Sequence, residues 1–238
     1  MCTRYLLLQQ HYRAVLRRLG VRPPEDFVSR YNIAPGRPIP AIRLTPGGGA
    51  RAAAALRWGL VPAWAKDASA GARLINARAA SLAEKPSFRD ALRERRCVIP
   101  ASGFYEWEVA DAHRLPWLFT RRDGQPFGLA GLWESWRGPA GEVLETCAVV
   151  TTEPNEVVRP IHHRMPVAFT PEECEQWLAP GPLAAGVVAR LLRPLAAADL
   201  TARRVGCRVN QVGNEGEDCL APPEPGGDEP PRQLPLEL

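Results

Sequence analysis

The chain has 238 residues, of which 45% are hydrophobic and 24% are charged, and its formal net charge is +4. A chain of this length and composition can bury a core, which excludes an intrinsically disordered protein and a miniprotein that depends on disulfides. It has no run of about 18 apolar residues and no apolar signal segment behind Met1, so we exclude the usual membrane-spanning and secreted classes and expect a cytoplasmic protein.

The first predicted element is a short amphipathic helix over residues 9–19, where apolar residues recur at helical spacing until Gly20. From there to about residue 170, Gly and Pro separate short β-type runs, which is typical of antiparallel sheets. The predicted strands cover residues 41–44, 97–99, 117–120, 127–130 and 147–152.

A second helical zone begins at Thr170, where a capping-box sequence with Pro171 at the first helical position predicts a helix to about residue 178. A further helix is expected at 183–192 and a last strand at 205–209. Residues 221–238 contain six prolines and carry a net charge of −3, which predicts a disordered, Pro-rich acidic tail behind one domain over residues 1–220. The fold class is therefore α+β, mostly antiparallel β with a few peripheral helices.

Six cysteines lie far apart without a C-x-x-C pair, so we expect buried thiols rather than a disulfide framework or a metal site, and no cofactor. Cys2 differs from the others by its position. Removal of the initiator methionine would leave an α-amine and a thiol on one residue, and such an aminothiol condenses with an aldehyde to a Schiff base and then a thiazolidine ring. The alternative is that Cys2 is an incidental second residue.

Two further residue types suggest acid–base chemistry. Glu106 lies on a predicted strand that places Phe104 and Glu106 on one face and Tyr105 and Trp107 on the other, and a carboxylate among aromatic residues is desolvated, which raises its pKa. An exposed edge-strand glutamate is the alternative. His162 belongs to a His pair between two prolines, a setting that can orient an imidazole, although such pairs are more often plain surface or core features.

The basic residues favour a nucleic-acid partner, because 28 of the 30 are arginines, whose planar guanidinium groups suit phosphates and bases. A GC-rich coding sequence is the alternative explanation for the surplus of arginines. Asn32, Asn76 and Arg78 can donate to phosphate, sugar or a base edge, and Trp64 and Trp107 can stack on bases. Turn-forming asparagines and core tryptophans are the alternatives.

Six local sequences combine Gly or Pro with polar and aromatic side chains, as in sites built on loops. They read MCTR at 1–4, YNIAPG at 31–36, RWGLVPAW at 57–64, NAR at 76–78, PASGFYEW at 100–107 and HHRMP at 162–166. In this order they resemble the SOS response-associated peptidase (SRAP) family, whose members shield abasic sites in single-stranded DNA. The resemblance extends from Cys2 to about Pro222 and implies an SRAP-like fold with a basic groove.

The resemblance also implies roles for individual residues. Cys2 is the nucleophile that links covalently to the abasic-site aldehyde, Asn76 and Glu106 position and assist the sugar, and His162 is an acid–base residue near the ring-opened deoxyribose. The residues that would hold the DNA backbone are Arg4, Asn32, Arg78 and Arg164. In the family an acidic residue usually follows Asn-Ala-Arg, whereas here Ala79-Ala80-Ser81 follows.

The expected partner is therefore single-stranded DNA with abasic sites, bound by a monomer that is cytoplasmic and nucleoid-associated when on DNA. Two other function classes remain open at this point. One is an N-terminal-nucleophile hydrolase or cysteine peptidase, which would also explain self-removal of Met1. The other is a non-catalytic single-strand binding module that uses the same arginines and tryptophans.

Overall fold

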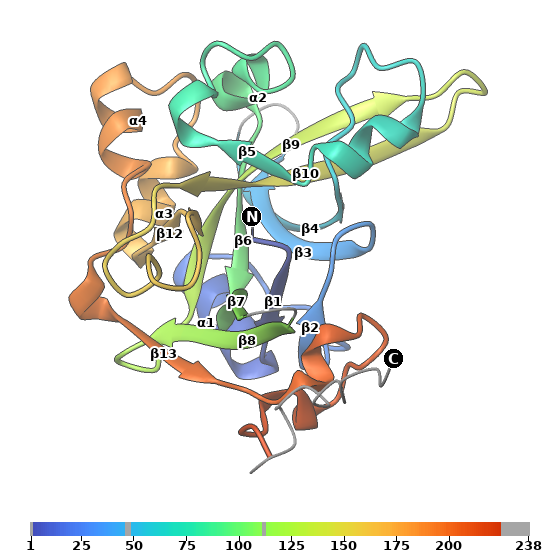
Figure 1. The fold of residues 1–238 in the computed structure, drawn as a ribbon. Helices are drawn as coiled ribbons and strands as arrows, with labels where there is room; N and C mark the ends of the chain where they lie inside the picture. The colour runs from blue at the N-terminus through green and yellow to red at the C-terminus, as the bar shows by residue number, and fades with distance from the viewer. Residues whose placement is uncertain (1, 46–48, 111–112, 225–238) are drawn as a thin grey trace, which may run out of the picture.

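The computed structural model describes residues 2–45, 49–110 and 113–224, which form two β-sheets surrounded by short helices (Figure 1). The smaller sheet has the strand order β13-β8-β7-β1-β2, and all of its pairings are antiparallel. Its strands are β1 (Arg4–Leu7), β2 (Arg30–Ile33), β7 (Gly103–Ala110), β8 (His113–Arg121) and β13 (Leu200–Arg204).

The larger sheet closes on itself. Its order is β11-β10-β4-β3-β6-β9-β12, and β10 also pairs with β9, so that β10, β4, β3, β6 and β9 form a ring. Its strands are β3 (Pro38–Leu44), β4 (Arg51–Trp58), β5 (Asn76–Arg78), β6 (Arg96–Ala101), β9 (Phe127–Arg137), β10 (Val143–Thr152), β11 (Met165–Pro166) and β12 (Ala168–Phe169). β10 pairs in parallel with β4 and β5, and the other pairings among the described strands are antiparallel. The predicted α+β class with mostly antiparallel strands is confirmed.

The helices lie at the periphery of the sheets (Figure 1). They are α1 (Gln9–Arg18), α2 (Arg89–Glu94), α3 (Pro171–Trp177) and α4 (Ala185–Leu191). The three predicted helices correspond to α1, α3 and α4. The capping box of α3 is present, since Thr170 Oγ1 accepts from the Glu173 amide and the Glu173 carboxylate accepts from the Thr170 amide. Within the described ranges, none of the helices has the length and apolar character needed to span a membrane.

Several elements were not predicted, among them α2, β1 and β2, and two of the differences have a clear physical reason. β4 was not predicted because its four alanines carry no β signal, yet it pairs with the whole length of β3 from Arg51 to Arg57. The last strand is β13, which ends at Arg204, so the strand predicted over 205–209 is wrong. Val205 and Val209 are buried in one cluster four residues apart, and a 3₁₀ helix, Cys207–Asn210, brings them together.

Strand β7 separates two cores, because successive side chains point to opposite faces. Phe104 belongs to the main core and stacks on Phe119 with ring centroids 5.0 Å apart. Tyr105 and Trp107 belong to a smaller cluster on the other face, as their alternation predicted. Glu106 therefore lies on a strand that is covered by a hydrophobic cluster on each face.

The end of the described chain is packed rather than free. The Gly206 amide donates to the Ala221 carbonyl at 2.8 Å, so the first residue of the predicted tail lies against the domain. Most of that predicted tail, residues 225–238, lies outside the described residues. Five of the cysteines are buried thiols: Cys2, Cys97, Cys147, Cys174 and Cys219.

Candidate active site

Cys2 lies at the junction of the two sheets, two residues before Arg4, where β1 begins and pairs with Tyr105 of β7. Its side chain is fully buried. The Asn76 side-chain amide donates to the Cys2 backbone carbonyl at 2.8 Å. Asn76 begins β5, whose parallel pairing with β10 sets Asn76 opposite Val149. The larger sheet thus supplies a hydrogen bond that fixes the backbone of the second residue in the chain.

Glu106 lies beside this residue on β7. Its carboxyl group is 2% exposed, and Oε1 has no hydrogen-bond partner among the described residues. Burial raises the pKa of Glu106 to about 7, against the opposing charge of Arg114. A carboxyl group with this pKa is present in both protonation states near neutral pH, so it can donate or accept a proton without a large cost.

His162 completes the group from the loop between β10 and β11. Its Nδ1 lies 3.9 Å from Glu106 Oε2, and the same nitrogen is 2.9 Å from the Arg164 carbonyl and 3.1 Å from the Arg164 amide. Burial lowers the pKa of His162, so the imidazole is neutral near pH 7. The backbone of Arg164 therefore orients the neutral imidazole of His162 toward the carboxyl group of Glu106, whose pKa is raised.

The Cys2 thiol is not activated in this arrangement. Burial, reinforced by the negative charge of Glu106, raises its pKa far above the usual value. The thiol is therefore protonated, and no Cys–His ion pair exists at neutral pH. Chemistry at this residue has to begin at another atom or to deprotonate the thiol in a later step.

The carbonyl acceptor of Asn76, Oδ1, is buried without a hydrogen-bond partner among the described residues, as is Glu106 Oε1. An unpaired buried polar atom costs about 1–3 kcal/mol, so folded proteins rarely leave two of them in one place. Both atoms belong to residues that the sequence indicated for chemistry. They are positioned to interact with a polar ligand that replaces the missing partners.

Arg78 and Arg164 lie at one end of β10. Thr151 pairs with Arg78 on β5 in the strand register, and Arg164 donates to the Thr151 carbonyl at 2.6 Å and to its hydroxyl at 2.9 Å. Arg164 also contacts Glu153 at 3.3 Å. The Arg78 charge helps to lower the pKa of Arg164, after burial, and the Arg78 side chain is exposed. Two guanidinium groups thus share one end of the site.

Asn32 and Arg4 are bound to the protein itself. Asn32 is fully buried, and its amide donates to the carbonyls of Val209, Gln211 and Asn214. Arg4 donates to Asn32 Oδ1 and to the Val209 carbonyl, both at 2.8 Å. Since its amide group is engaged by the protein on both the donor and the acceptor side, we assign Asn32 to holding Arg4 and the 207–214 segment.

The two tryptophans expected to stack on bases differ in exposure. Trp107 is 7% exposed, and its indole donates to Asn210 Oδ1 at 2.7 Å. Because its ring is covered, Trp107 is better placed as a support for neighbouring side chains than as a stacking surface, and we correct its expected role accordingly. Trp64 is 68% exposed and remains the candidate for stacking.

Sequence reasoning missed Arg114. This exposed residue of β8 lies with its guanidinium carbon 5.8 Å from the centroid of the Trp107 ring, and its charge acts on Glu106 and His162. The register of the β7–β8 hairpin gives its position: Arg114 pairs with Val109, which lies two residues from Trp107 on β7, so Arg114 and Trp107 project from one face of the sheet.

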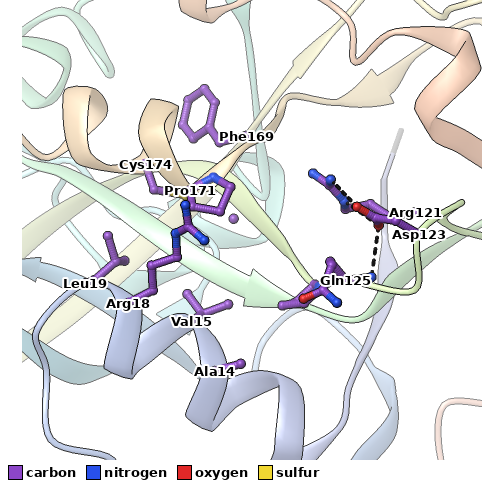
Figure 2. A pocket seen from close by; sticks show the side chains of 12 residues that line it. Ala14, Val15, Arg18, Leu19, Arg121, Asp123, Gln125, Phe169, Pro171 and Cys174 are labelled. Carbon is purple, nitrogen blue, oxygen red and sulfur yellow. Dashed lines mark hydrogen bonds and ion pairs between the residues drawn. The ribbon is translucent and has the colours of Figure 1, made fainter.

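A cavity of about 280 Å³ lies elsewhere, between α1, the β8–β9 turn and α3 (Figure 2). It contains none of the candidate residues. Its two arginines are paired, Arg18 with Glu172 and Arg121 with Asp123, so they offer no free charge to an anion. The reactive residues are therefore not gathered in this concave part of the surface.

Known proteins share both the sequence and the fold. The family model described as "SOS response associated peptidase (SRAP)" matches residues 1–212. Abasic site processing protein YoqW of Bacillus subtilis is 37% identical over 224 residues, which cover 92% of this chain and 99% of that protein. YoaM, named likewise and from the same organism, is 40% identical over 199 residues, covering 83% and 87%.

Among solved structures, a protein from Bacteroides thetaiotaomicron superimposes with a TM-score of 0.81 at 25% sequence identity, covering 93% of this chain and 99% of that one. The family match spans the β1 to β13 core together with Cys2, Asn76, Glu106 and His162. The chain belongs to the SOS response associated peptidase (SRAP) family.

Proposed function

We propose that this protein captures abasic sites in single-stranded DNA by forming a covalent bond through Cys2. The observation that supports this most is the grouping of an N-terminal aminothiol residue with Asn76, Glu106 and His162, two of which have unpaired buried oxygens. The names of the relatives, abasic site processing proteins, agree with it.

The reaction begins with the amine, because the thiol is protonated. After Met1 is removed, the Cys2 α-amine attacks C1 of the open-chain aldehyde; the N–C bond forms, and loss of one water gives an iminium. An abasic sugar is mostly a closed hemiacetal, so ring opening has to move a proton from the hemiacetal hydroxyl to the ring oxygen. Glu106 and His162 are placed to transfer protons in this step.

Ring closure then uses the thiol. Glu106 accepts the thiol proton, the sulfur forms a bond to the iminium carbon, and the electron pair of the C=N bond moves to the nitrogen. The product is a thiazolidine, and no oxidant or reductant is needed. The proton acceptor matters here because burial keeps the thiol pKa high. Closure also removes the imine, which would otherwise promote elimination and strand cleavage.

Arg78 and Arg164 supply positive charge at one end of the site for the DNA backbone, and exposed Trp64 offers a ring for an unpaired base. This arrangement requires a single strand, because duplex DNA does not present base faces. We expect a monomer that acts in the cytoplasm and associates with the nucleoid through DNA.

A cysteine peptidase is the second candidate. It requires a thiolate or a Cys–His ion pair, whereas the Cys2 thiol is buried and protonated and the pKa of His162 is lowered. Self-removal of Met1 remains part of the proposal, since one intramolecular turnover makes smaller demands than hydrolysis of a separate peptide.

The test is incubation with a single-stranded oligonucleotide that contains one abasic site, followed by a denaturing gel and peptide mass spectrometry. We expect a heat-stable adduct on the peptide that begins with Cys2. Cys2→Ser retains an amine, so it should give an adduct that only borohydride traps. Binding of intact and abasic strands with equal affinity and no adduct would instead indicate a non-catalytic single-strand binding protein.

A further inference from the structure

Arg4 and Arg114 lie over the same indole ring but differ in what else they bind. Their guanidinium carbons are 5.7 Å and 5.8 Å from the centroid of Trp107. Arg4 donates to Asn32 and to the carbonyls of Val209 and Asn210, so its donors are engaged by the protein. For the Arg114 guanidinium, the described residues provide no ion pair and no hydrogen bond.

The position of Arg114 is nevertheless fixed. Asn210 accepts from the Trp107 indole at 2.7 Å and donates to the Arg114 carbonyl at 3.2 Å, which ties β7, β8 and the 207–210 helix together at this point. Trp107 is buried and supports the guanidinium from below. A cation held on an aromatic ring, with its donors free and exposed to solvent, is prepared to bind an anion.

We infer that Arg114 is a phosphate-binding residue of the site, which contacts the DNA backbone from the five-stranded sheet while Arg78 and Arg164 contact it from the larger sheet. This rests on the proposed function, which supplies the anion. It also changes the role of Arg4, which then holds the Trp107 support rather than the DNA.

Binding a phosphate on Arg114 would also affect the proton-transfer pair. The Arg114 charge lowers the pKa of both Glu106 and His162, so its neutralisation by a phosphate raises both. The other groups that act on the pair are the Cys2 thiol, the amino terminus of the chain, His163 and the backbone of Arg164. DNA binding thus favours the protonated forms that open the hemiacetal ring.

The test compares Arg114→Gln and Arg114→Lys with Arg17→Gln, a matched control on α1 that loses the same charge at an exposed position. Binding of an intact single-stranded oligonucleotide is measured between low and high salt, and crosslinking to the abasic strand is measured across pH. For Arg114→Gln we expect about tenfold weaker binding at low salt and a salt slope smaller in magnitude by about 0.7.

The pH profile of crosslinking by Arg114→Gln should move to higher pH, which a merely structural role would not produce, and Arg114→Lys should restore the salt slope. A wild-type slope and a wild-type pH profile in Arg114→Gln, with normal crosslinking by the wild type, would overturn the inference and leave the proposed function intact. Absence of crosslinking by the wild type would instead contradict the proposed function itself.

Discussion

Two buried charged residues in this protein have opposite environments. Arg96 is 6% exposed and donates five hydrogen bonds, to the carbonyls of Leu92, Arg93, Trp177, Ala179 and Gly181. Glu106 is 2% exposed, and one of its oxygens has no partner in the described part of the chain. The carbonyls around Arg96 satisfy its charge and join α2 to the end of α3. The surroundings of Glu106 leave one carboxylate oxygen without a hydrogen bond, beside Cys2.

The comparison separates structural from functional burial. A buried charge that serves the fold has all of its hydrogen bonds, because each missing one costs free energy. A buried charge that serves chemistry has a shifted pKa and keeps a hydrogen-bonding atom unpaired, so that the ligand can bind to it. Together with their position beside Cys2, this assigns Glu106 and Asn76 to the proposed site, whereas we assign Arg96 and Asn32 to the scaffold.

The largest expected effect is on reaction rate. Glu106→Gln removes the proton acceptor and donor while preserving the shape of the side chain, so crosslinking should slow by about 100-fold or more. Glu108→Gln, the same change on the same strand, is the control, because Glu108 accepts from the Trp117 indole and lies outside the proposed site. The rates are measured by denaturing gels under single-turnover conditions. Equal rates for the two variants would remove Glu106 from the chemistry.

For Arg96, the structural member of the pair, the expected effect is on stability. Arg96→Met leaves five carbonyls, two of them in buried hydrogen bonds, without their donor, and the free energy of unfolding should fall by about 3 kcal/mol or more. For a chain of this size that corresponds to a Tm lower by roughly 10 °C. Arg93→Met, at the exposed neighbouring position, should leave the Tm within about 2 °C of the wild type. Calorimetry that finds the two variants equally stable would show that Arg96 is not structural.

The stability of the wild type should depend on pH through Glu106. Since the folded-state pKa is raised to about 7 from an ordinary value of 4.5, the stabilising contribution is complete below about pH 4.5 and is lost as the pH rises through 7. The loss amounts to about 3 kcal/mol. In Glu106→Gln the unfolding free energy should vary less between pH 5 and 8, as measured by urea titration. A wild type and a variant with parallel pH profiles would mean that the carboxyl group is solvated.

A smaller effect is expected at Asn76. Asn76→Ala removes the hydrogen bond to the Cys2 carbonyl, so the amine is less well oriented, and crosslinking should slow about tenfold with little change in DNA affinity. A weaker affinity at an unchanged maximal rate would place Asn76 in DNA binding instead. The two quantities are separated by varying the protein concentration.

Much of the site was predictable from the sequence, because short-range patterns encode it. Strand alternation placed Glu106 and Trp107 on opposite faces, and the position of Cys2 in the chain indicated its chemistry. Contacts between distant segments were not predictable. The burial of Asn32 depends on three carbonyls about 180 residues away, one in the segment that was misread as a strand and two just after it.

In the fold, too, local elements were predictable and contacts between distant segments were not. Helices with caps, such as α3, follow local rules and were predicted. The alanine-rich β4 forms because β3 and β10 pair with it from both sides, which no local propensity indicates. Arg114 was missed for a related reason, since its significance lies in the register of a hairpin and in the support provided by Asn210.

The most direct test of the account is the intact mass of the protein after reaction with an abasic oligonucleotide, for the chain that begins with Cys2 and for a chain with a blocked, extended N-terminus. The account predicts that the first gains the mass of the DNA less one water and survives heating, because the amine and the thiol both bond to one carbon. The extended chain should bind the strand but gain no mass. A heat-stable adduct on the extended chain, at the yield of the first, would contradict aminothiol capture.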